Sequence, residues 1–242
     1  MCIRDRAKAE LIEALASDGL AVLNADDERV STMARVSSAP VVTFGVAAHA
    51  DVRIDESRIG ATGCVSATVR TPWGAGQISM HVPGSHIATD AAAAVAVAGH
   101  LGCDVSTAAA LVSSFQAVSG RMQVHQLDRT RTLIDDSYNA NPSSMEAALR
   151  TLASIAANNH VAVLGAMAEI SDPQGEHARI QSLAETLGVR MIVLEHAPYP
   201  QQGVGVDEAV AIVNGFGGNT AVLVKGSRAA RTERVVEALL RG

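Results

Sequence analysis

Residues 131–156 read RTLIDDSYNANPSSMEAALRTLASIA, and this stretch decides the fold class. It begins as a hydrophobic strand whose polar residues gather at its C-terminal end. An Asn-Pro pair suited to the first turn of a helix comes next. Apolar side chains then recur at helical spacing, at Met145, Ala148, Leu149, Leu152 and Ile155. The stretch therefore predicts a strand, a polar loop and an amphipathic helix, in that order.

The same alternation continues toward the C-terminus. Apolar strand patterns occur in HVAVLGAM (160–167), RMIVLEH (190–196) and TAVLVKG (220–226), and a closing helix is expected over SRAARTERVVEALL (227–240). Strands that alternate with helices predict an α/β fold with a parallel, doubly wound, Rossmann-like sheet. In such sheets ligands bind beyond the carboxyl ends of the strands. The polar clusters DDSYN, GAMAE, LEH and KGSR come directly after those ends in this sequence.

The N-terminal half has a different rhythm. A short amphipathic helix is expected over residues 7–17, with Leu11, Ile12 and Leu15 on one face. The buried strands predicted after it are LAVLNADD (20–27) and PVVTFGV (40–46). Short alternating segments between residues 51 and 82, separated by Gly and Pro turns, indicate an antiparallel meander.

Two helices are then expected at residues 86–100 and 105–116, the second with Asp104 as its N-cap. The pattern changes again at SGRM (119–122), where the strand–helix alternation begins. We therefore expect two domains, residues 1–120 and residues 121–242.

Composition excludes several classes of protein. Hydrophobic residues make up 48% of the chain and charged residues 18%, which favours a folded core over disorder. The net charge of −6 argues against a nucleic-acid surface, since phosphate binding needs clustered Lys and Arg. No apolar run is long enough to cross a bilayer, so no membrane insertion is expected.

The N-terminus and the cysteines point to the cytoplasm. The first six residues, MCIRDR, are charged and lead into no apolar segment of a signal peptide. They also fit poorly with the helical segment after them, and we interpret them as a remnant of cloning or sequence assembly. Cys2, Cys64 and Cys103 match no zinc or redox spacing and are expected to be reduced.

Several motifs together resemble one enzyme family. DDSYNANPSSM, with AKAEL, AVLNADDERV, PGSH, SGRM, VAVLGAMAE, EHARI and VKGSR in the same order, is similar to the Mur ligases. Within them it resembles the branch that joins D-Ala-D-Ala to UDP-MurNAc-tripeptide in peptidoglycan precursor synthesis. The resemblance begins near residue 7 and covers nearly the whole chain.

This resemblance implies an ATP-dependent amide ligase that works through an acyl-phosphate, with Mg²⁺ as a cofactor and a monomeric state. It also implies the remainder of a central P-loop-type ATPase domain, without its P-loop, followed by a Rossmann-like C-terminal domain. Cations around the transferring phosphoryl group, and groups that orient the attacking amine, are what such chemistry needs.

The resemblance also implies roles for the residues that would meet the nucleotide. Lys8 would become carbamylated and bind Mg²⁺ through oxygen; the alternative is an exposed lysine on a helix. His86 and Asp90 would contact adenine, unless Asp90 is only a helix-surface residue. Arg121 would reach the phosphates with its guanidinium, and Asp136 would hold the ribose.

Other residues would meet the two substrates that are joined. Tyr138, Asn139 and Asn141 would face the cleft where they react, although an Asx-type turn with capping residues would also suit this segment. Lys225, Ser227 and Arg228 would suit the carboxylate of D-Ala-D-Ala. The structural alternative for this last segment is a helix cap at Ser227.

The sequence also departs from the family pattern. Ile87 and Asp90 stand where relatives have two Asn, and Ala166 stands where relatives have Asp. Asp90 can accept a hydrogen bond from the adenine amino group but cannot also donate to a ring nitrogen. Glu169 and His177 are interpreted as residues that line the cleft or, equally, as a surface pair.

No Gly-x-x-Gly-Lys-Thr/Ser phosphate loop occurs in the chain. We therefore expect a fragment of a ligase that is inactive by itself. Two alternatives remain: a truncated or degraded paralogue that binds without turnover, and a related ligase such as a folylpolyglutamate synthetase.

Overall fold

The computed structural model describes residues 3–242 of the chain, and the side chains from residue 6 onward. Cys2 and the start of the MCIRDR segment lie outside the described residues. The chain forms two compact units. The first, the N-terminal unit, holds most of the chain up to Phe115; the second, the C-terminal unit, begins at Gln116 and also includes the short segments Gly60–Gly63 and Val82–Gly84.

The N-terminal unit is built on a five-stranded sheet in the order β1-β2-β3-β4-β5. The strands are β1 (Ala21–Asn24), β2 (Val41–Gly45), β3 (Val52–Ile59), β4 (Cys64–Thr71) and β5 (Gly74–Pro83). β1, β2 and β3 run parallel, whereas β3 and β4 pair antiparallel. The expected meander is thus present and extends a short parallel sheet.

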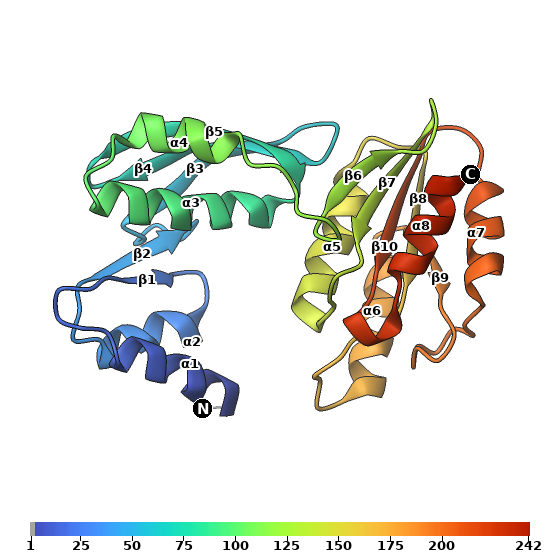
Figure 1. Cartoon of the computed structure of the whole chain (residues 1–242), viewed down its shortest axis with the longest axis horizontal. Coiled ribbons are helices and arrows are strands. Elements are labelled where there is room, and N and C mark those ends of the chain that lie inside the picture. The colour runs from blue at the N-terminus through green and yellow to red at the C-terminus, as the bar shows by residue number, and fades with distance from the viewer. Residues whose placement is uncertain (1–2) are drawn as a thin grey trace. The chain divides into compact units, whose positions relative to one another are not determined.

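Helices cover this sheet. The N-terminal unit contains α1 (Ile3–Glu13), α2 (Glu28–Ser31), the 3₁₀ turn η1 (Thr32–Val36), α3 (Ser85–His100) and α4 (Val105–Ser113). α3 lies against β1 to β4 and α4 packs on α3, while α1 and α2 lie beside β1 (Figure 1). The Ala-rich face of α3 buries Ala88, Ala92 and Ala96 against the sheet, because small side chains allow a close approach.

Two local predictions can be compared directly. Asp104 caps α4 as expected, since its carboxylate accepts a hydrogen bond from the Thr107 amide at 2.8 Å. The predicted buried face of the first helix was wrong at Leu11, which is 70% exposed. Ile12 and Leu15 pack against the small core around β1, and Leu15 does so from beyond the end of α1.

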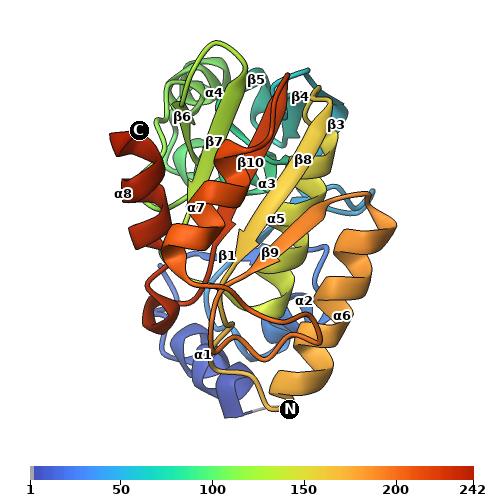
Figure 2. The same cartoon turned by 90° about the vertical axis from the view of Figure 1, so that its right-hand side faces the viewer.

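The C-terminal unit has the predicted doubly wound sheet, in the order β6-β7-β10-β8-β9 (Figure 2). Its strands are β6 (Gln123–Gln126), β7 (Arg131–Asp136), β8 (Asn159–Leu164), β9 (Arg190–Val193) and β10 (Thr220–Lys225). β7 to β10 are parallel. β6 is an antiparallel edge strand that the sequence pattern did not predict.

The helices of the C-terminal unit form two layers. α5 (Pro142–Ser154) and α6 (Pro173–Thr186) pack on one face of the sheet, and α7 (Val206–Asn214) and α8 (Glu233–Arg241) on the other (Figure 1). The central strand β10 is buried at every position. This fully buried strand explains why its sequence is a continuous apolar run and not an alternating one.

The closing helix begins later than predicted. Residues Arg228–Ala230 form a separate 3₁₀ turn, η2, and Arg231 has a left-handed backbone with φ 52°. The helix itself starts only at Glu233. The segment before α8 packs closely on Gly165, because glycine has no Cβ: a Cβ at this position would lie 2.6 Å from Thr232 Cγ2.

Candidate active site at the carboxyl ends of β7, β8 and β10

The strand ends that carry polar clusters lie side by side at one edge of the sheet. Lys225, the last residue of β10, lies opposite Asp136 on β7 and opposite Leu164 on β8. On the other side of β8, Leu164 pairs with Val193 of β9. The DDSYN, KGSR, GAMAE and LEH segments therefore leave the same edge of one parallel sheet, which is where ligands bind in such folds.

An ion pair joins two of these segments. Lys225 Nζ lies 2.6 Å from Asp136 Oδ2 and donates a second hydrogen bond to the Asn139 carbonyl at 2.9 Å. The lysine side chain is only 2% exposed, whereas that of Asp136 is 14% exposed. The aspartate thus keeps a solvent-facing part that could still accept from a ligand, while the ammonium points into the protein.

The segment before β6 is fastened to the same loop. The Met122 amide donates to Asp136 Oδ1 at 3.2 Å, and the Tyr138 amide donates to the Gly120 carbonyl at 3.0 Å. The Arg121 guanidinium lies 4.1 Å from the centre of the Tyr138 ring, in cation–π contact. Arg121 and Tyr138 are both exposed, so a guanidinium and a phenol face solvent beside Asp136.

Asn141 and Asn139 have structural partners in the loop. Asn141 Oδ1 accepts from the Ser144 amide at 2.9 Å, and the Asn141 amide donates to Ser144 Oγ at 3.1 Å. This reciprocal pair is a capping box at the start of α5. Asn139 Oδ1 accepts from the Ala140 amide. The predicted catalytic roles of both residues are not tested by these contacts, but the Asn141 contacts agree with the capping alternative.

The KGSR and GAMAE segments are bonded to each other. The Ser227 amide donates to the Ala166 carbonyl at 2.8 Å, and the Gly165 amide donates to the Lys225 carbonyl at 2.9 Å. Ser227 is buried and precedes η2, but its side chain forms no cap hydrogen bond. Arg228 is exposed. Because α8 begins six residues after Ser227, the expected helix start at this point is absent.

His177 supports the GAMAE turn from within the protein. It is fully buried, its Nε2 accepts from the Met167 amide at 2.9 Å, and its Nδ1 lies 2.5 Å from the Pro173 carbonyl. Desolvation lowers the pKa of its imidazole, so the ring is neutral. The expected surface pair is therefore wrong for His177, which is a buried structural histidine. Glu169 has a left-handed backbone with φ 57°.

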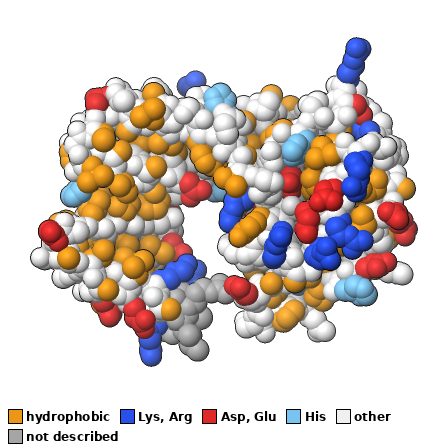
Figure 3. Space-filling view, viewed as in Figure 1, with side chains coloured by type: hydrophobic (Ala, Val, Ile, Leu, Met, Phe, Trp, Pro, Cys, Tyr) orange, Lys and Arg blue, Asp and Glu red, His pale blue; other side chains and the backbone are white. Residues whose placement is uncertain are grey.

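A hollow lies beside these segments, at the ends of β8, β9 and β10. Its volume is about 460 Å³. Its floor contains Met167, Leu194 and Val206, and its rim contains the charged side chains of Arg231 and Arg234 together with Glu195, His196 and the buried Ser227. Basic and acidic side chains gather on this unit over α8 (Figure 3). Arg231 and Arg234 were not singled out from the sequence pattern, which placed Arg231 inside the closing helix; Arg231 instead precedes α8, and Arg234 lies in its first turn.

The remaining predicted residues lie in the N-terminal unit. Lys8 is exposed on α1, and His86 and Asp90 occupy successive turns at the start of α3. Desolvation by the surrounding chain raises the pKa of the Asp90 carboxyl, and the charge of His86 opposes this shift. Asp90 still reaches solvent, so its carboxyl stays accessible to a ligand.

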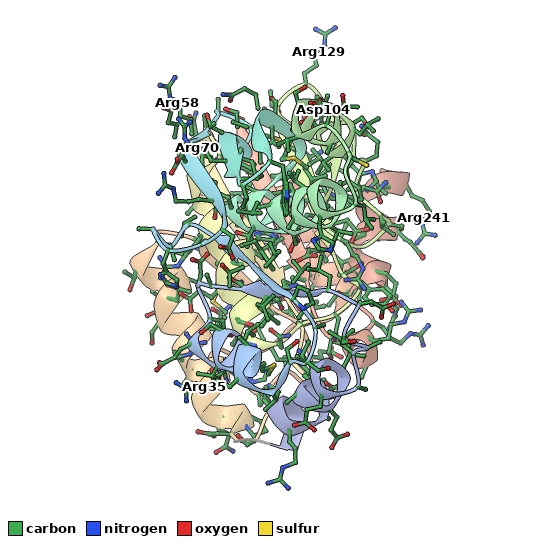
Figure 4. All side chains as sticks on the ribbon, turned by 90° about the vertical axis from the view of Figure 1, so that its left-hand side faces the viewer. Arg35, Arg58, Arg70, Asp104, Arg129 and Arg241 are labelled. Carbon is green, nitrogen blue, oxygen red and sulfur yellow. The ribbon has the colours of Figure 1, made fainter. Side chains whose placement is uncertain are left out.

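Neither a metal-binding cluster nor a membrane-spanning helix occurs in the described part of the chain. Residues 3–242 contain no cluster of three or more His, Cys, Asp or Glu side chains arranged to hold a metal ion. No helix within that range is long and apolar enough to span a bilayer. Cys64 and Cys103 are free. Arg35 of η1, Arg58 of β3, Arg241 of α8 and Arg129 of the loop between β6 and β7 project outward (Figure 4).

Comparison with known proteins identifies relatives along the whole chain. Residues 5–98 match the model of the Mur ligase middle domain, and residues 120–239 match that of the Mur ligase glutamate ligase domain. The UDP-N-acetylmuramoyl-tripeptide–D-alanyl-D-alanine ligase of Mycobacterium tuberculosis (strain CDC 1551 / Oshkosh) is 34% identical over 97% of this chain and 53% of its own length. The ligase of the same name from Escherichia coli (strain K12) is 31% identical over 97% and 55%.

Solved structures agree with the sequence comparison. The crystal structure of MurF from Acinetobacter baumannii matches 98% of this chain and 55% of its own, with a TM-score of 0.86 and 25% identity. The chain thus spans about half the length of the curated relatives and of the solved structure that it matches.

Proposed function

The chain belongs to the Mur ligase family, and we propose that it forms part of a ligase that joins D-Ala-D-Ala to UDP-MurNAc-tripeptide with ATP. The observation that carries the proposal is the DDSYNANP segment at the convergent ends of β7, β8 and β10. The relatives that share at least 30% identity over nearly the whole chain are named for this reaction. These relatives favour the D-Ala-D-Ala reaction over the two alternatives, a folylpolyglutamate synthetase and a non-catalytic paralogue.

Each unit carries residues that we assign to the nucleotide. Asp136 offers a partly exposed carboxylate for the ribose hydroxyls, and Arg121 offers a guanidinium for phosphate oxygens. His86 and Asp90 on α3 would take the adenine. Lys8, if carbamylated, would supply oxygen to Mg²⁺. ATP supplies the phosphoryl group that activates the tripeptide carboxylate.

The lining of the hollow at the ends of β8, β9 and β10 is complementary to a small zwitterionic dipeptide. Arg231 and Arg234 could bind a terminal carboxylate, and Glu195 could bind an ammonium. The apolar floor with Met167 and Leu194 suits methyl side chains. We therefore place D-Ala-D-Ala here, with Ser227 at the same rim. Tyr138, Asn139 and Asn141 stay assigned to the adjoining side, where the tripeptide carboxylate would approach.

We further propose that the functional domain boundary follows Gly120. The family models end at residue 98 and resume at residue 120, and the two compact units separate between Phe115 and Gln116. The segment between them would connect the ATP-binding and C-terminal parts of a monomeric enzyme that works in the cytoplasm.

An acceptor panel tests this function. The ligase polypeptide that carries this sequence is incubated with ATP, Mg²⁺ and UDP-MurNAc-tripeptide, and phosphate release is measured with D-Ala-D-Ala, L-alanine, D-glutamate or L-glutamate. We expect release with D-Ala-D-Ala alone. Glutamate-dependent release when a folate replaces UDP-MurNAc-tripeptide would support the folylpolyglutamate alternative. No release with any acceptor would support a non-catalytic binding protein.

A further inference from the structure

Lys225 is a buried charged residue to which the proposed function gives no role. It ends β10, it is 2% exposed, and it is among the largest fully buried side chains of the chain. Its ammonium is committed to Asp136 Oδ2 at 2.6 Å and to the Asn139 carbonyl at 2.9 Å. A lysine so placed cannot reach a dipeptide in solvent without breaking both contacts.

The contacts continue from Asp136 into the segment that carries Arg121. Asp136 Oδ1 accepts from the Met122 amide, while Oδ2 accepts from Lys225, so one carboxylate joins two separate segments. Met122 has φ 53° and Gly120 has φ 73°. A non-glycine residue keeps such a backbone only where its surroundings hold it.

The loop after β7 supplies a second attachment to this segment. The Tyr138 amide donates to the Gly120 carbonyl, and the Tyr138 ring lies under the Arg121 guanidinium at 4.1 Å. Lys225 fixes the same loop through the Asn139 carbonyl. One ammonium therefore restrains the loop and, through Asp136, the backbone on the C-terminal side of Arg121.

We propose that Lys225 is a positioning residue that orients Asp136 and Arg121 for the nucleotide and does not itself contact a ligand. An ammonium suits the role because it offers three donors and a full charge to a carboxylate. Removing one partner of a buried pair leaves the other charge uncompensated, so Asp136 would turn toward solvent. The effect on ATP rests on the proposed function, whereas the restraint on the loop does not.

The first test measures the restraint in the chain itself. Lys225→Met keeps the unbranched apolar stem, one heavy atom shorter, and removes the ammonium. Val222→Ala is the matched control, because it truncates a buried side chain on the same strand. Amide hydrogen exchange is followed by NMR. We expect exchange at Met122 and Tyr138 to accelerate by at least about tenfold in Lys225→Met, relative to the core amide of Val163.

The control should lower overall stability without this selective acceleration. If Lys225→Met leaves exchange at Met122 and Tyr138 unchanged relative to Val163, the proposal is overturned. Should this variant not fold, Lys225→Gln is measured in the same way, since its amide can still donate to the Asn139 carbonyl but brings no charge to Asp136.

The second test separates positioning from general stability by kinetics in the ligase polypeptide. Lys225→Met should raise KM for ATP by roughly tenfold and KM for D-Ala-D-Ala by less than about twofold, with partial recovery in Lys225→Arg. Added to Asp136→Asn, Lys225→Met should raise the ATP KM no further, because both changes act through one group.

Two outcomes oppose the proposal. An additive double variant, or equal changes in both KM values, would assign Lys225 a separate role. An unsubstituted polypeptide with no ligase activity would instead count against the proposed function, and the amide-exchange result would then decide the positioning role by itself.

Discussion

The substitution His177→Phe tests how the GAMAE turn is held. Phenylalanine keeps an aromatic ring of similar shape against Tyr199, whose ring centre lies 4.6 Å away. It removes the acceptor of the Met167 amide, which donates to His177 Nε2 at 2.9 Å in a fully buried site. A buried N–H without a partner costs about 1–3 kcal/mol. For a protein of this size, about 2 kcal/mol lowers Tm by roughly 4–8 °C.

The same variant has a signature in the pH dependence of stability. Desolvation lowers the pKa of His177 below its ordinary value of 6.5. As pH falls below that value, His177 binds a proton in the unfolded chain but stays neutral in the folded chain. The contribution of His177 to the free energy of unfolding is therefore complete above the ordinary pKa and is lost as pH falls toward the folded-state pKa. The slope from one group cannot exceed about 1.4 kcal/mol per pH unit.

Urea unfolding between about pH 7.5 and pH 5.5 measures both effects. The unsubstituted chain should lose stability toward acid more steeply than His177→Phe does, and the two curves should converge. His196→Gln is the control, because the His196 side chain is 95% exposed. Equal slopes in the chain and in His177→Phe would refute the assignment of a neutral, buried imidazole, and an unchanged midpoint at pH 7.5 would refute the hydrogen bond's contribution.

Three other substitutions probe the site and its surroundings. Gly165→Ala should destabilise the chain by about 1–3 kcal/mol, because the new Cβ would lie 2.6 Å from Thr232 Cγ2; Thr232→Ser should recover part of the loss in thermal melts. Asp136→Asn should raise KM for ATP roughly tenfold. It should also lower stability, because it leaves the buried Lys225 ammonium without its carboxylate partner. An unchanged nucleotide affinity would reject the ribose role. Arg234→Ala should raise KM for D-Ala-D-Ala roughly tenfold in steady-state assays, whereas Arg241→Ala, on the last turn of α8, should leave it unchanged; equal effects would remove the dipeptide from that hollow.

The doubly wound fold could be predicted because each parallel strand is a buried apolar run followed by a polar cluster. β10 is the clearest case, since all six of its residues are buried. The meeting of the strand ends also follows from parallel topology alone. By contrast, β6 was missed because its residues Gln123–Gln126 carry no apolar alternation, and its place at the sheet edge comes from pairing with β7.

The details of the site depended on tertiary packing. The pairing of Lys225 with Asp136 joins residues 89 positions apart, and it requires β10 to lie beside β7. The break at Arg231 arises where Thr232 packs over Gly165, and a helix-forming sequence gives no sign of it. Arg231, at that break, and Arg234, in the first turn of α8, both line the hollow.

Titration of the ¹⁵N-labelled chain with D-Ala-D-Ala would decide whether the amine substrate binds at this edge of the sheet. We expect amide shifts to change in residues 165–168, 194–196, 204–206 and 227–234, around the hollow at the ends of β8, β9 and β10. L-Ala-L-Ala should give smaller changes at the same concentration. Shifts that are equal for both dipeptides, or that fall outside these segments, would contradict the assignment of the hollow to D-Ala-D-Ala.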